Sequence, residues 1–515
     1  MSITTPAWVR DAVFYQIFPD RFARSGRVDP PGQLEPWDAP ITVHGFKGGD
    51  LYGVADRLPY LADLGITAIY LNPIFSSASN HRYHTYDYFS VDPLLGGDDA
   101  LRELLDRAHA AGIRVILDGV FNHASRGFWP FNHVLECGLA SPYVDWFHVD
   151  RDALAAGRAL RAYPDESLRH ALEQAGGADR FGSEFVGGLG YKAWWDMPAL
   201  PKLNTDNPKV REYLMQVAEH WIRFGADGWR LDVAAEIDDD EFWREFRRRV
   251  RAIDPEAYIV AEVWMEDHRW LRGDQFDAYM NYPLGFAILS FAAGSHRDDA
   301  AIAAHGDVRA GVRPDDGPTF LERVRHQLTT YDPAVTAVQL NLLGSHDMPR
   351  ILTICAGDRD AVRLATLIQL TLPGAPCIYY GDEIGMAGGH DPYCRGAFPT
   401  DEAAWDVALR GYVRGIARLR HAHPVLRHGA WSPAGAGGHL AAYARHDDAA
   451  TWIVALNAAE EPGRLEVAVP GPADGTLEPV ITDGWTWPPG GPAVVEAGRA
   501  WVELPARSAR LLQRV

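Results

Sequence analysis

The feature that most constrains the fold is a unit that recurs along the chain, made of an amphipathic helix, a glycine and a short apolar run. Helical stripes of apolar residues end at Gly65, Gly112 and Gly225, and an apolar run follows each glycine. A glycine at that place is a helix C-terminal signal, and apolar runs of this length are typical of buried strands. The first of these helices is expected over 51–64. Strands that alternate with helices imply parallel βαβ units.

Eight apolar runs along the chain predict strands, with helical stripes between them. Eight parallel strands with interleaved helices predict an α/β fold, the (β/α)8 TIM barrel. The active site of such a barrel lies at the carboxyl ends of the strands. The predicted strands are 13–20, 66–73, 113–118, 228–234, 257–263, 276–282, 337–343 and 377–380.

Two further segments are expected beside the barrel. The interval between the second and third glycines exceeds that between the first and second by about 60 to 70 residues, more than a βα connection needs. The extra segment predicts a small subdomain inserted after the third strand. Near the C-terminus, short alternating runs with turn signals predict an all-β domain. We expect a catalytic barrel over 1–122 and 192–428, an inserted subdomain B over 123–191, and a C-terminal β-sandwich over 429–515.

Composition excludes several classes of partner. The chain has 49 basic and 69 acidic side chains, a net charge of −20, which argues against nucleic acid and anionic membranes. No apolar run approaches the roughly 18 residues of a membrane helix, and residues 1–10 have no signal-peptide core. The scattered cysteines are expected to be free thiols: Cys137, Cys355, Cys377 and Cys394. We therefore expect a cytoplasmic enzyme.

One predicted strand places two charges on the same face. Arg230 and Asp232 stand two residues apart, so their side chains point the same way in an extended strand. A positive charge beside a carboxylate keeps it ionised, as a nucleophile requires. Buried pairs of this kind also brace folds without doing chemistry, so the pair alone leaves both hypotheses open.

Polar side chains gather where the predicted strands end. Such a set fits either a metal site or glycoside hydrolysis by paired carboxylates. Metal-dependent hydrolase barrels usually place histidines at the first strand, where this chain has Gln16 and Phe18, so paired carboxylates are favoured. The residues at the strand ends are Asp118, Asn122, His123, Arg230, Asp232, Glu262, His346 and Asp347.

The chain resembles the α-amylase superfamily and, within it, the cyclomaltodextrinase, neopullulanase and maltogenic amylase group. The resemblance covers about residues 13–420, and four motifs in the same order make it specific. A further motif, Leu200-Pro-Lys-Leu-Asn204, is similar to one that marks this group. The four motifs are Asp118-Gly-Val-Phe-Asn-His123, Gly228-Trp-Arg-Leu-Asp-Val-Ala234, Glu262-Val-Trp264 and Leu343-Gly-Ser-His-Asp347.

The resemblance implies a role for each catalytic residue. Asp232 would be the nucleophile that forms a β-glycosyl-enzyme intermediate. Glu262 would protonate the leaving oxygen and then deprotonate water. Asp347 would hold sugar hydroxyls as the ring flattens. The resemblance therefore implies a retaining hydrolase of α-1,4-glucosidic bonds in maltodextrins or cyclodextrins.

The resemblance also implies a set of substrate-binding residues. His123 and His346 would bond the hydroxyls of the sugar at the cleavage point, and Tyr86 would stack under its ring. Asp391 and Arg395 would hold the next sugar. Arg230 would keep the nucleophile ionised, whereas Asp118 and Asn122 are expected to shape the third-strand loop.

Three departures from the group's pattern bear on partners and cofactors. The group's N-terminal β-domain is expected to be absent, which favours a monomer. Ala235 stands where the group usually has an asparagine on the acceptor side. Arginines in the loop over 23–27 disfavour calcium, for which Asp29, Gly48 and Asp50 are weak candidate ligands, so no metal or other cofactor is expected.

Two alternatives to hydrolysis remain open. An α-glucan transferase or isomerase, such as a trehalose-forming enzyme, could use the same barrel and the same acids. A non-catalytic member of the fold would be used for binding or assembly, but all three acids are present. In each case the expected partner is an α-glucan oligosaccharide.

Overall fold

The computed structural model describes residues 3–167 and 188–515. Its central element is an eight-stranded parallel sheet in the order β8-β7-β6-β5-β2-β1-β10-β9. A parallel bridge between Met280 and Leu340 joins the two edges, so the sheet closes into a barrel. The prediction of an eight-stranded barrel is confirmed. The strands are β1 (Phe14–Ile17), β2 (Ala68–Leu71), β5 (Arg114–Gly119), β6 (Gly228–Leu231), β7 (Tyr258–Ala261), β8 (Ala278–Tyr279), β9 (Leu340–Leu342) and β10 (Ala375–Tyr379).

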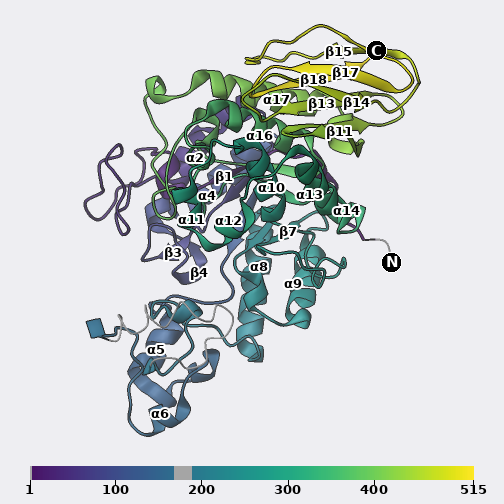
Figure 1. The fold of residues 1–515 in the computed structure, drawn as a ribbon. Helices are drawn as coiled ribbons and strands as arrows, with labels where there is room; N and C mark the ends of the chain where they lie inside the picture. The colour runs from purple at the N-terminus through teal and green to yellow at the C-terminus, as the bar shows by residue number, and fades with distance from the viewer. Residues whose placement is uncertain (1–2, 168–187) are drawn as a thin grey trace.

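Helices surround the barrel (Figure 1). Gly65 and Gly225 end two of them in the left-handed conformation, with φ of +91° and +116°, as the sequence predicts. The longer helices are α4 (Gly97–Ala110), α8 (Pro208–Phe224), α9 (Asp240–Ile253), α10 (Tyr282–Ala293), α13 (Gly317–Thr329), α16 (Arg359–Thr371) and α17 (Val407–Ala422). The shorter ones are α1 (Pro19–Phe22), α2 (Leu51–Asp56), α3 (Leu58–Leu64), α11 (Asp299–Ala303), α12 (Gly306–Gly311), α14 (Pro333–Thr336), α15 (Ile351–Ile354) and α18 (Val425–His428).

The single helix expected over 51–64 is wrong, because two helices occupy that segment. The first, α2, ends at Asp56, and α3 begins at Leu58 with Pro59 in its first turn. Proline has no backbone N–H and its ring crowds the preceding turn, so it starts a new helix rather than continuing one. The apolar stripe that runs across the break was the misleading signal.

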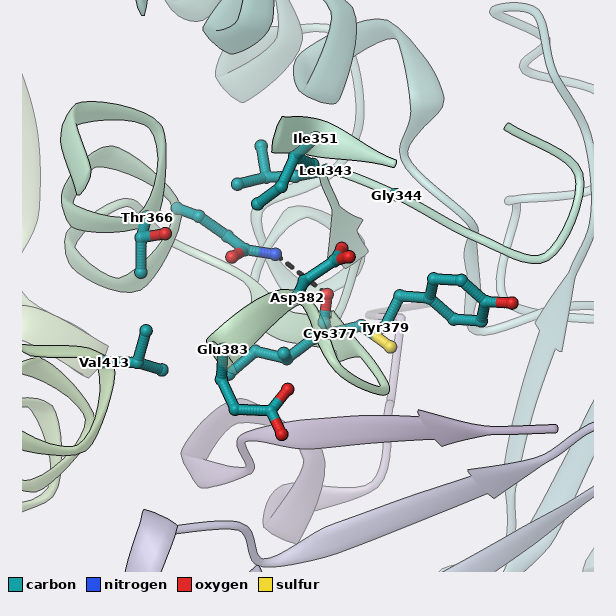
Figure 2. Close-up of a pocket in the computed structure, with 11 residues that line it drawn as sticks. Leu343, Gly344, Ile351, Thr366, Cys377, Tyr379, Asp382, Glu383 and Val413 are labelled. Carbon is teal, nitrogen blue, oxygen red and sulfur yellow. Dashed lines mark hydrogen bonds between the residues drawn. The ribbon is translucent and has the colours of Figure 1, made fainter. Parts of the chain in front are cut away.

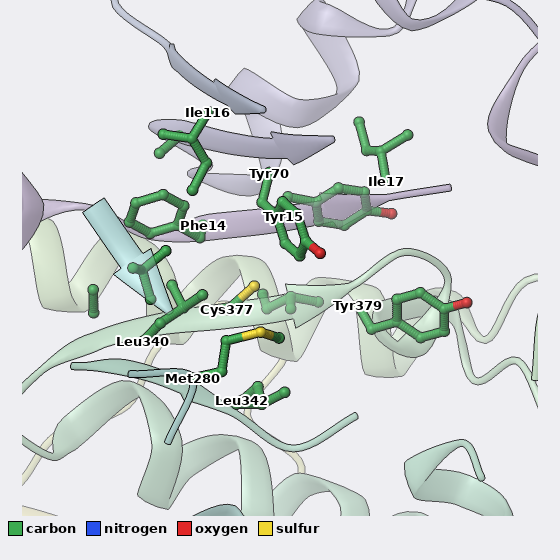
Figure 3. Packing of buried hydrophobic residues seen from close by; sticks show 14 of the residues in the cluster. Phe14, Tyr15, Ile17, Tyr70, Ile116, Met280, Leu340, Leu342, Cys377 and Tyr379 are labelled. Atoms are coloured by element: carbon green, nitrogen blue, oxygen red, sulfur yellow. The ribbon is translucent and has the colours of Figure 1, made fainter. Parts of the chain in front are cut away.

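Apolar side chains fill the barrel interior. Phe14, Met280 and Leu340 come from three different strands or their ends and are at most 1% exposed. Figure 3 shows them packed together with Ile116 and Leu342. Because the interior is packed, substrate chemistry is confined to the rim at the strand ends.

Two structured segments lie outside the barrel, at opposite ends in Figure 1. Helices α5 (Trp129–Cys137) and α6 (Arg151–Ala155) belong to the segment after β5, near the short strands β3 (Phe75–Ser77) and β4 (Thr85–Val91). Residues 168–187 of the expected subdomain lie outside the described residues. The boundaries expected at 123–191 stay a prediction.

The C-terminal region is all-β, as expected. Its six-stranded sheet has the order β11-β12-β13-β18-β15-β16, and β14 pairs with β17 in a second sheet. Apolar residues such as Ile453, Val467, Val502 and Leu512 are buried in one cluster of this region. The strands are β11 (Ala430–Gly437), β12 (Leu440–His446), β13 (Thr451–Asn457), β14 (Gly463–Ala468), β15 (Gly475–Pro479), β16 (Ala493–Val495), β17 (Arg499–Leu504) and β18 (Ser508–Arg514). Among the described helices none is long and apolar enough to span a membrane.

A buried ion pair braces the loop between β3 and β4, and its loss is expected to destabilise the protein. The Arg82 Nε atom lies 2.9 Å from Asp92 Oδ2, with side chains 1% and 4% exposed. Arg82→Met keeps the bulk but leaves the Asp92 charge unpaired, so the free energy of unfolding should fall by about 3–5 kcal/mol. Urea denaturation measures this loss.

The matched control is Arg107→Met. Arg107 pairs with Asp56 at 2.9 Å, but these two side chains are 40% and 54% exposed. The loss there should be about 0–1 kcal/mol. Equal losses in the two variants would contradict the assignment of stability to the buried pair.

Candidate active site at the carboxyl ends of the barrel strands

A single buried guanidinium contacts three carboxylates at the rim. Arg230 Nη1 lies 2.8 Å from Asp232 Oδ1 and 3.0 Å from Asp118 Oδ1, and Nη2 lies 3.0 Å from Glu262 Oε2. Arg230 is 0% exposed. The expectation that Arg230 and Asp232 share a face of the strand is confirmed, and the guanidinium also links the neighbouring strands.

Strand register explains why these groups meet. Asp118 on β5 is paired with Arg230 on β6, and β6 lies between β5 and β7. The Asp232 N–H donates to the Gly119 carbonyl at 3.0 Å, and the Glu262 N–H donates to the Leu231 carbonyl at 2.9 Å. Asp232 and Glu262 are thus each the first residue beyond a strand, which brings residues far apart in the sequence to the same level of the rim.

Burial and the Arg230 charge shift the pKa of the Asp232 carboxyl in opposite directions. Removal from water is the largest influence and raises the pKa of the Asp232 carboxyl well above its usual range. The Arg230 guanidinium lowers this pKa, whereas the neighbouring carboxylates of Glu262 and Asp118 raise it further. An ionised Asp232 therefore depends on Arg230.

The Glu262 carboxylate is held by both of its oxygens. The Val233 N–H donates to Oε2 at 2.9 Å, and the indole N–H of Trp264 donates to Oε1 at 3.1 Å. The Trp264 ring in turn stacks on Tyr282, with ring centroids 3.6 Å apart at 11°, and on His305 at 5.3 Å. These contacts fix the orientation of Glu262 toward the rim.

Asp347 lies between an arginine and a histidine. Its Oδ1 is 3.1 Å from Arg395 Nη2, and its Oδ2 is 3.2 Å from His346 Nε2. Burial raises the pKa of Asp347 to about 7, and the Arg395 charge opposes this rise. The Gln16 amide nitrogen lies 2.9 Å from His346 Nδ1, so that ring nitrogen accepts and Nε2 carries the proton toward Asp347.

Both predicted histidines are buried and neutral. Burial lowers the pKa of His123 to about 3 and that of His346 well below its usual range. The Asn122 side-chain amide lies 3.3 Å from His123 Nδ1. A neutral imidazole can donate to or accept from a sugar hydroxyl without adding charge to the site.

Asp391 and Arg395 line a cavity beside Asp347. Arg395 Nη1 lies 2.7 Å from Asp391 Oδ1, so one guanidinium joins the cavity to Asp347. The cavity has a volume of about 100 Å³. Its other lining residues are Arg21, Ile41, Thr42, Val43, Asn80, His81 and Pro392.

Tyr86 lies on β4 and is half-buried. Its ring lies against Gly127, where an added Cβ would come within 2.2 Å of the ring. Its predicted stacking under a sugar stays a prediction.

Sequence reasoning missed several residues that hold the site together. The hydroxyls of Tyr70 and Tyr83 donate to Asp118 Oδ2 at 2.6 and 2.8 Å. The Tyr83 ring also stacks on His346, with centroids 5.2 Å apart at 4°. Tyr83 lies three residues before Tyr86, but spacing alone does not show which of the two tyrosines faces the acids.

The adjacent acids Asp382 and Glu383, just beyond β10, belong to a separate, internal cavity. That cavity has a volume of about 10 Å³, room for about one water molecule. Figure 2 shows both carboxylates beside it. Asp382 pairs with Arg350 at 2.9 Å, and Glu383 accepts from the Tyr15 hydroxyl at 2.8 Å. We interpret this pair as structural.

The described residues contain no group of three or more histidine, cysteine, aspartate or glutamate side chains that could hold a metal ion. One of the residues named as weak calcium candidates is engaged otherwise. Asp50 accepts from the N–H groups of Ser25 and Gly53. The cysteines are free thiols, as expected.

Both the sequence and the fold of this chain are similar to those of known proteins. Residues 16–414 match the family model described as the α-amylase catalytic domain. The chain is 44% identical over 468 residues to a cyclomaltodextrinase of Geobacillus thermopakistaniensis (strain MAS1), covering 90% of this chain and 71% of that protein. It is 38% identical over 422 residues to the intracellular maltogenic amylase of Bacillus subtilis (strain 168), covering 81% of this chain and 63% of that protein. The solved structure of Ttha1563 from Thermus thermophilus superimposes with a TM-score of 0.87 and 46% identity, covering 99% of this chain and 100% of that one.

Proposed function

The chain belongs to the family of α-amylase catalytic domains, and from that premise we propose that it hydrolyses α-1,4-glucosidic bonds of maltodextrins and cyclodextrins with retention of configuration. The single observation that carries the proposal is the contact of Arg230 with Asp118, Asp232 and Glu262 at the buried rim. Paired carboxylates held at one end of a barrel suit glycoside hydrolysis by double displacement.

In the first chemical step Asp232 is the nucleophile. Its carboxylate attacks the anomeric carbon, and the bond to the leaving oxygen breaks as Glu262 gives that oxygen a proton. The product of this step is a β-glycosyl ester of Asp232 and a released sugar chain. Arg230 keeps Asp232 ionised against the effect of burial.

In the second step Glu262 takes a proton from water, and the water oxygen attacks the anomeric carbon of the ester. The bond between that carbon and Asp232 breaks, which releases the sugar and frees the Asp232 carboxylate. The two displacements together return the α configuration. Asp347 and the neutral His123 and His346 bond the hydroxyls of the reacting sugar. Asp391 and Arg395 bind the next sugar in the adjoining cavity.

Product analysis tests the proposal. The enzyme is incubated with β-cyclodextrin, pullulan, starch and maltotriose, and the products are separated by chromatography. New reducing ends and an initial α-anomer in the NMR spectrum are expected. Constant reducing sugar with new oligomers would instead indicate a transferase or isomerase, and a β-anomer would overturn the retaining mechanism.

The pH dependence of kcat/KM should reveal the titration of the Asp347 carboxyl. Because its pKa is about 7, activity of the free enzyme is expected to fall as the pH drops below about 7 and this carboxylate is protonated. Arg395→Gln removes the charge that lowers this pKa, so the acidic limb should move to higher pH. Arg395→Lys keeps the charge and should leave the limb near its original position; an unmoved limb in the Gln variant would contradict the assignment.

We also propose that the enzyme needs no calcium. In the loop after Phe22, the Arg24 guanidinium donates to the Lys47 carbonyl at 2.6 Å, and Asp50 is occupied by backbone N–H groups. A fixed arginine and an already bonded acid do not fit a cation site. Dialysis against EDTA is expected to leave kcat and the unfolding temperature unchanged, whereas recovery of lost activity by added calcium would refute the proposal.

The location in the cell is a further proposal. The intracellular maltogenic amylase of Bacillus subtilis supports a cytoplasmic location for this chain. Activity measured in fractionated cells tests it. The monomeric state expected from the sequence stays a prediction.

A further inference from the structure

A chain of hydrogen bonds crosses the rim of the barrel and joins acids on its two sides. Its side chains come from β1 and β5, from the ends of β2 and β9, and from the loop between β3 and β4. Four of its six members are at most 2% exposed, so water does not compete for most of these bonds. We call it the rim chain, and its members in order are Asp118, Tyr83, Asn72, Gln16, His346 and Asp347.

The charge of Asp118 sets the direction of the hydrogen bonds in the first half of the rim chain. An ionised carboxylate only accepts, and Asp118 lies 3.0 Å from the Arg230 guanidinium. The Tyr83 hydroxyl therefore donates to Asp118, at 2.8 Å. Because that hydroxyl has a single proton, the Asn72 amide nitrogen donates to its oxygen, at 3.0 Å. The remaining oxygen of Asn72, Oδ1, thus faces Gln16 as an acceptor.

The same direction continues through Gln16 to His346. Gln16 Nε2 donates one proton to Asn72 Oδ1 at 3.1 Å and lies 2.9 Å from His346 Nδ1, to which it donates the other. Half a turn of the Gln16 amide would instead oppose two oxygens, its own Oε1 and Asn72 Oδ1. Since the buried His346 ring is neutral, its only proton is on Nε2, 3.2 Å from Asp347 Oδ2. The opposite tautomer would place a lone pair against that carboxylate.

We propose that Gln16 is a positioning residue that acts on Asp347 through His346. Because His346 accepts from Gln16, its ring presents an N–H to Asp347 and to the sugar hydroxyls beside it. The proposal rests on the proposed function, in which His346 and Asp347 both bond the reacting sugar. It also gives a part in the reaction to β1, a strand that contains no charged residue.

The position of the proton on His346 is the first test, because it can be measured without substrate. Enzyme with isotope-labelled histidine is studied by nitrogen NMR, and His346→Asn identifies the signals of that ring by their loss. The wild-type ring is expected to carry a proton on Nε2 and none on Nδ1. In Gln16→Met, Nδ1 loses its donor, so its signal should move toward that of a ring nitrogen without a hydrogen bond. A proton on Nδ1 in the wild type, or an unmoved signal in the variant, would overturn the proposal.

A kinetic test asks whether Gln16 acts through His346. Methionine keeps the length of the side chain but has no N–H, so kcat on α-maltosyl fluoride is expected to fall about three- to tenfold in Gln16→Met, as for one lost hydrogen bond. In a His346→Asn background the same change should have no further effect, because asparagine does not reach the position of Nε2. An equal fall in both backgrounds would show that Gln16 does not act through His346 and would refute its positioning role.

The matched control is Gln369→Met. Gln369 is 2% exposed, and its amide donates to the carbonyls of Asn341 and Cys377, both at 2.9 Å. Each glutamine variant loses two hydrogen bonds, but the one at Gln369 should keep the wild-type kcat and the His346 signals. The changes expected of Gln16→Met, if they also occurred in Gln369→Met, would count against the proposal. Failure of the wild-type enzyme to turn over α-maltosyl fluoride would count against the proposed function instead, and the NMR signals would still decide the position of the proton.

Discussion

Replacing Glu262 by Gln is expected to lower kcat on maltohexaose by about 10²–10⁴-fold, the range typical of lost general acid–base catalysis. Glutamine keeps the shape of the side chain but has no proton to give to the leaving oxygen. The first step on α-maltosyl fluoride should be much less affected, because fluoride leaves without protonation. A rapid burst of fluoride followed by slow turnover is therefore expected in stopped-flow or electrode measurements.

The control for this variant is Glu266→Gln, further along the same loop. Glu266 bonds the His326 ring at 2.6 Å at the surface, so its loss should leave kcat unchanged. With Glu262→Ala, added azide should replace water in the second step and yield an α-maltosyl azide. Near-wild-type kcat on maltohexaose in Glu262→Gln would remove this residue from the mechanism.

Replacing Asp232 by Ala is expected to have the larger effect, about 10⁴–10⁶-fold in kcat, as for the loss of other enzyme nucleophiles. Unlike the Glu262 variants, this one should fail on maltohexaose and on α-maltosyl fluoride alike, because neither can form the ester. The two patterns separate a nucleophile from an acid. Initial rates on both substrates give the comparison.

The product formed with azide gives a second, stereochemical distinction. In Asp232→Ala, azide can attack α-maltosyl fluoride from the face that the carboxylate occupied, so a β-maltosyl azide is expected. Asp238→Ala serves as the control in the same loop, because Asp238 is 77% exposed and pairs with Arg269. An α-configured azide from Asp232→Ala would contradict the assignment of Asp232 as nucleophile. Thermal unfolding confirms that each variant is folded.

The barrel could be predicted because its signals are local. Helical stripes, glycines such as Gly65 and Gly225, and apolar runs each depend on neighbouring residues only. The one misassigned helix, over 51–64, shows the limit of such signals. Its apolar spacing continues across Pro59, where the missing N–H and the ring of the proline divide it into α2 and α3.

The convergence of the acids could be predicted from the sequence for a topological reason. In a parallel barrel every strand ends at the same rim, so residues just beyond the strands must converge. Asp118, Asp232 and Glu262 therefore share Arg230 in the structure. The partners that orient them could not be predicted in this way. Tyr83 reaches Asp118 from a loop, and its side-chain direction depends on the whole chain.

By itself, then, the sequence determined the eight-stranded barrel, the all-β C-terminal region and the set of rim residues, because periodicity and strand order specify backbone positions. The tertiary structure alone decided which side chains touch. Trp264 donates to Glu262, the Gln16 amide determines which nitrogen of His346 carries the proton, and the Trp194 ring stacks on His123. The last two contacts join residues distant in sequence, and no local pattern records them.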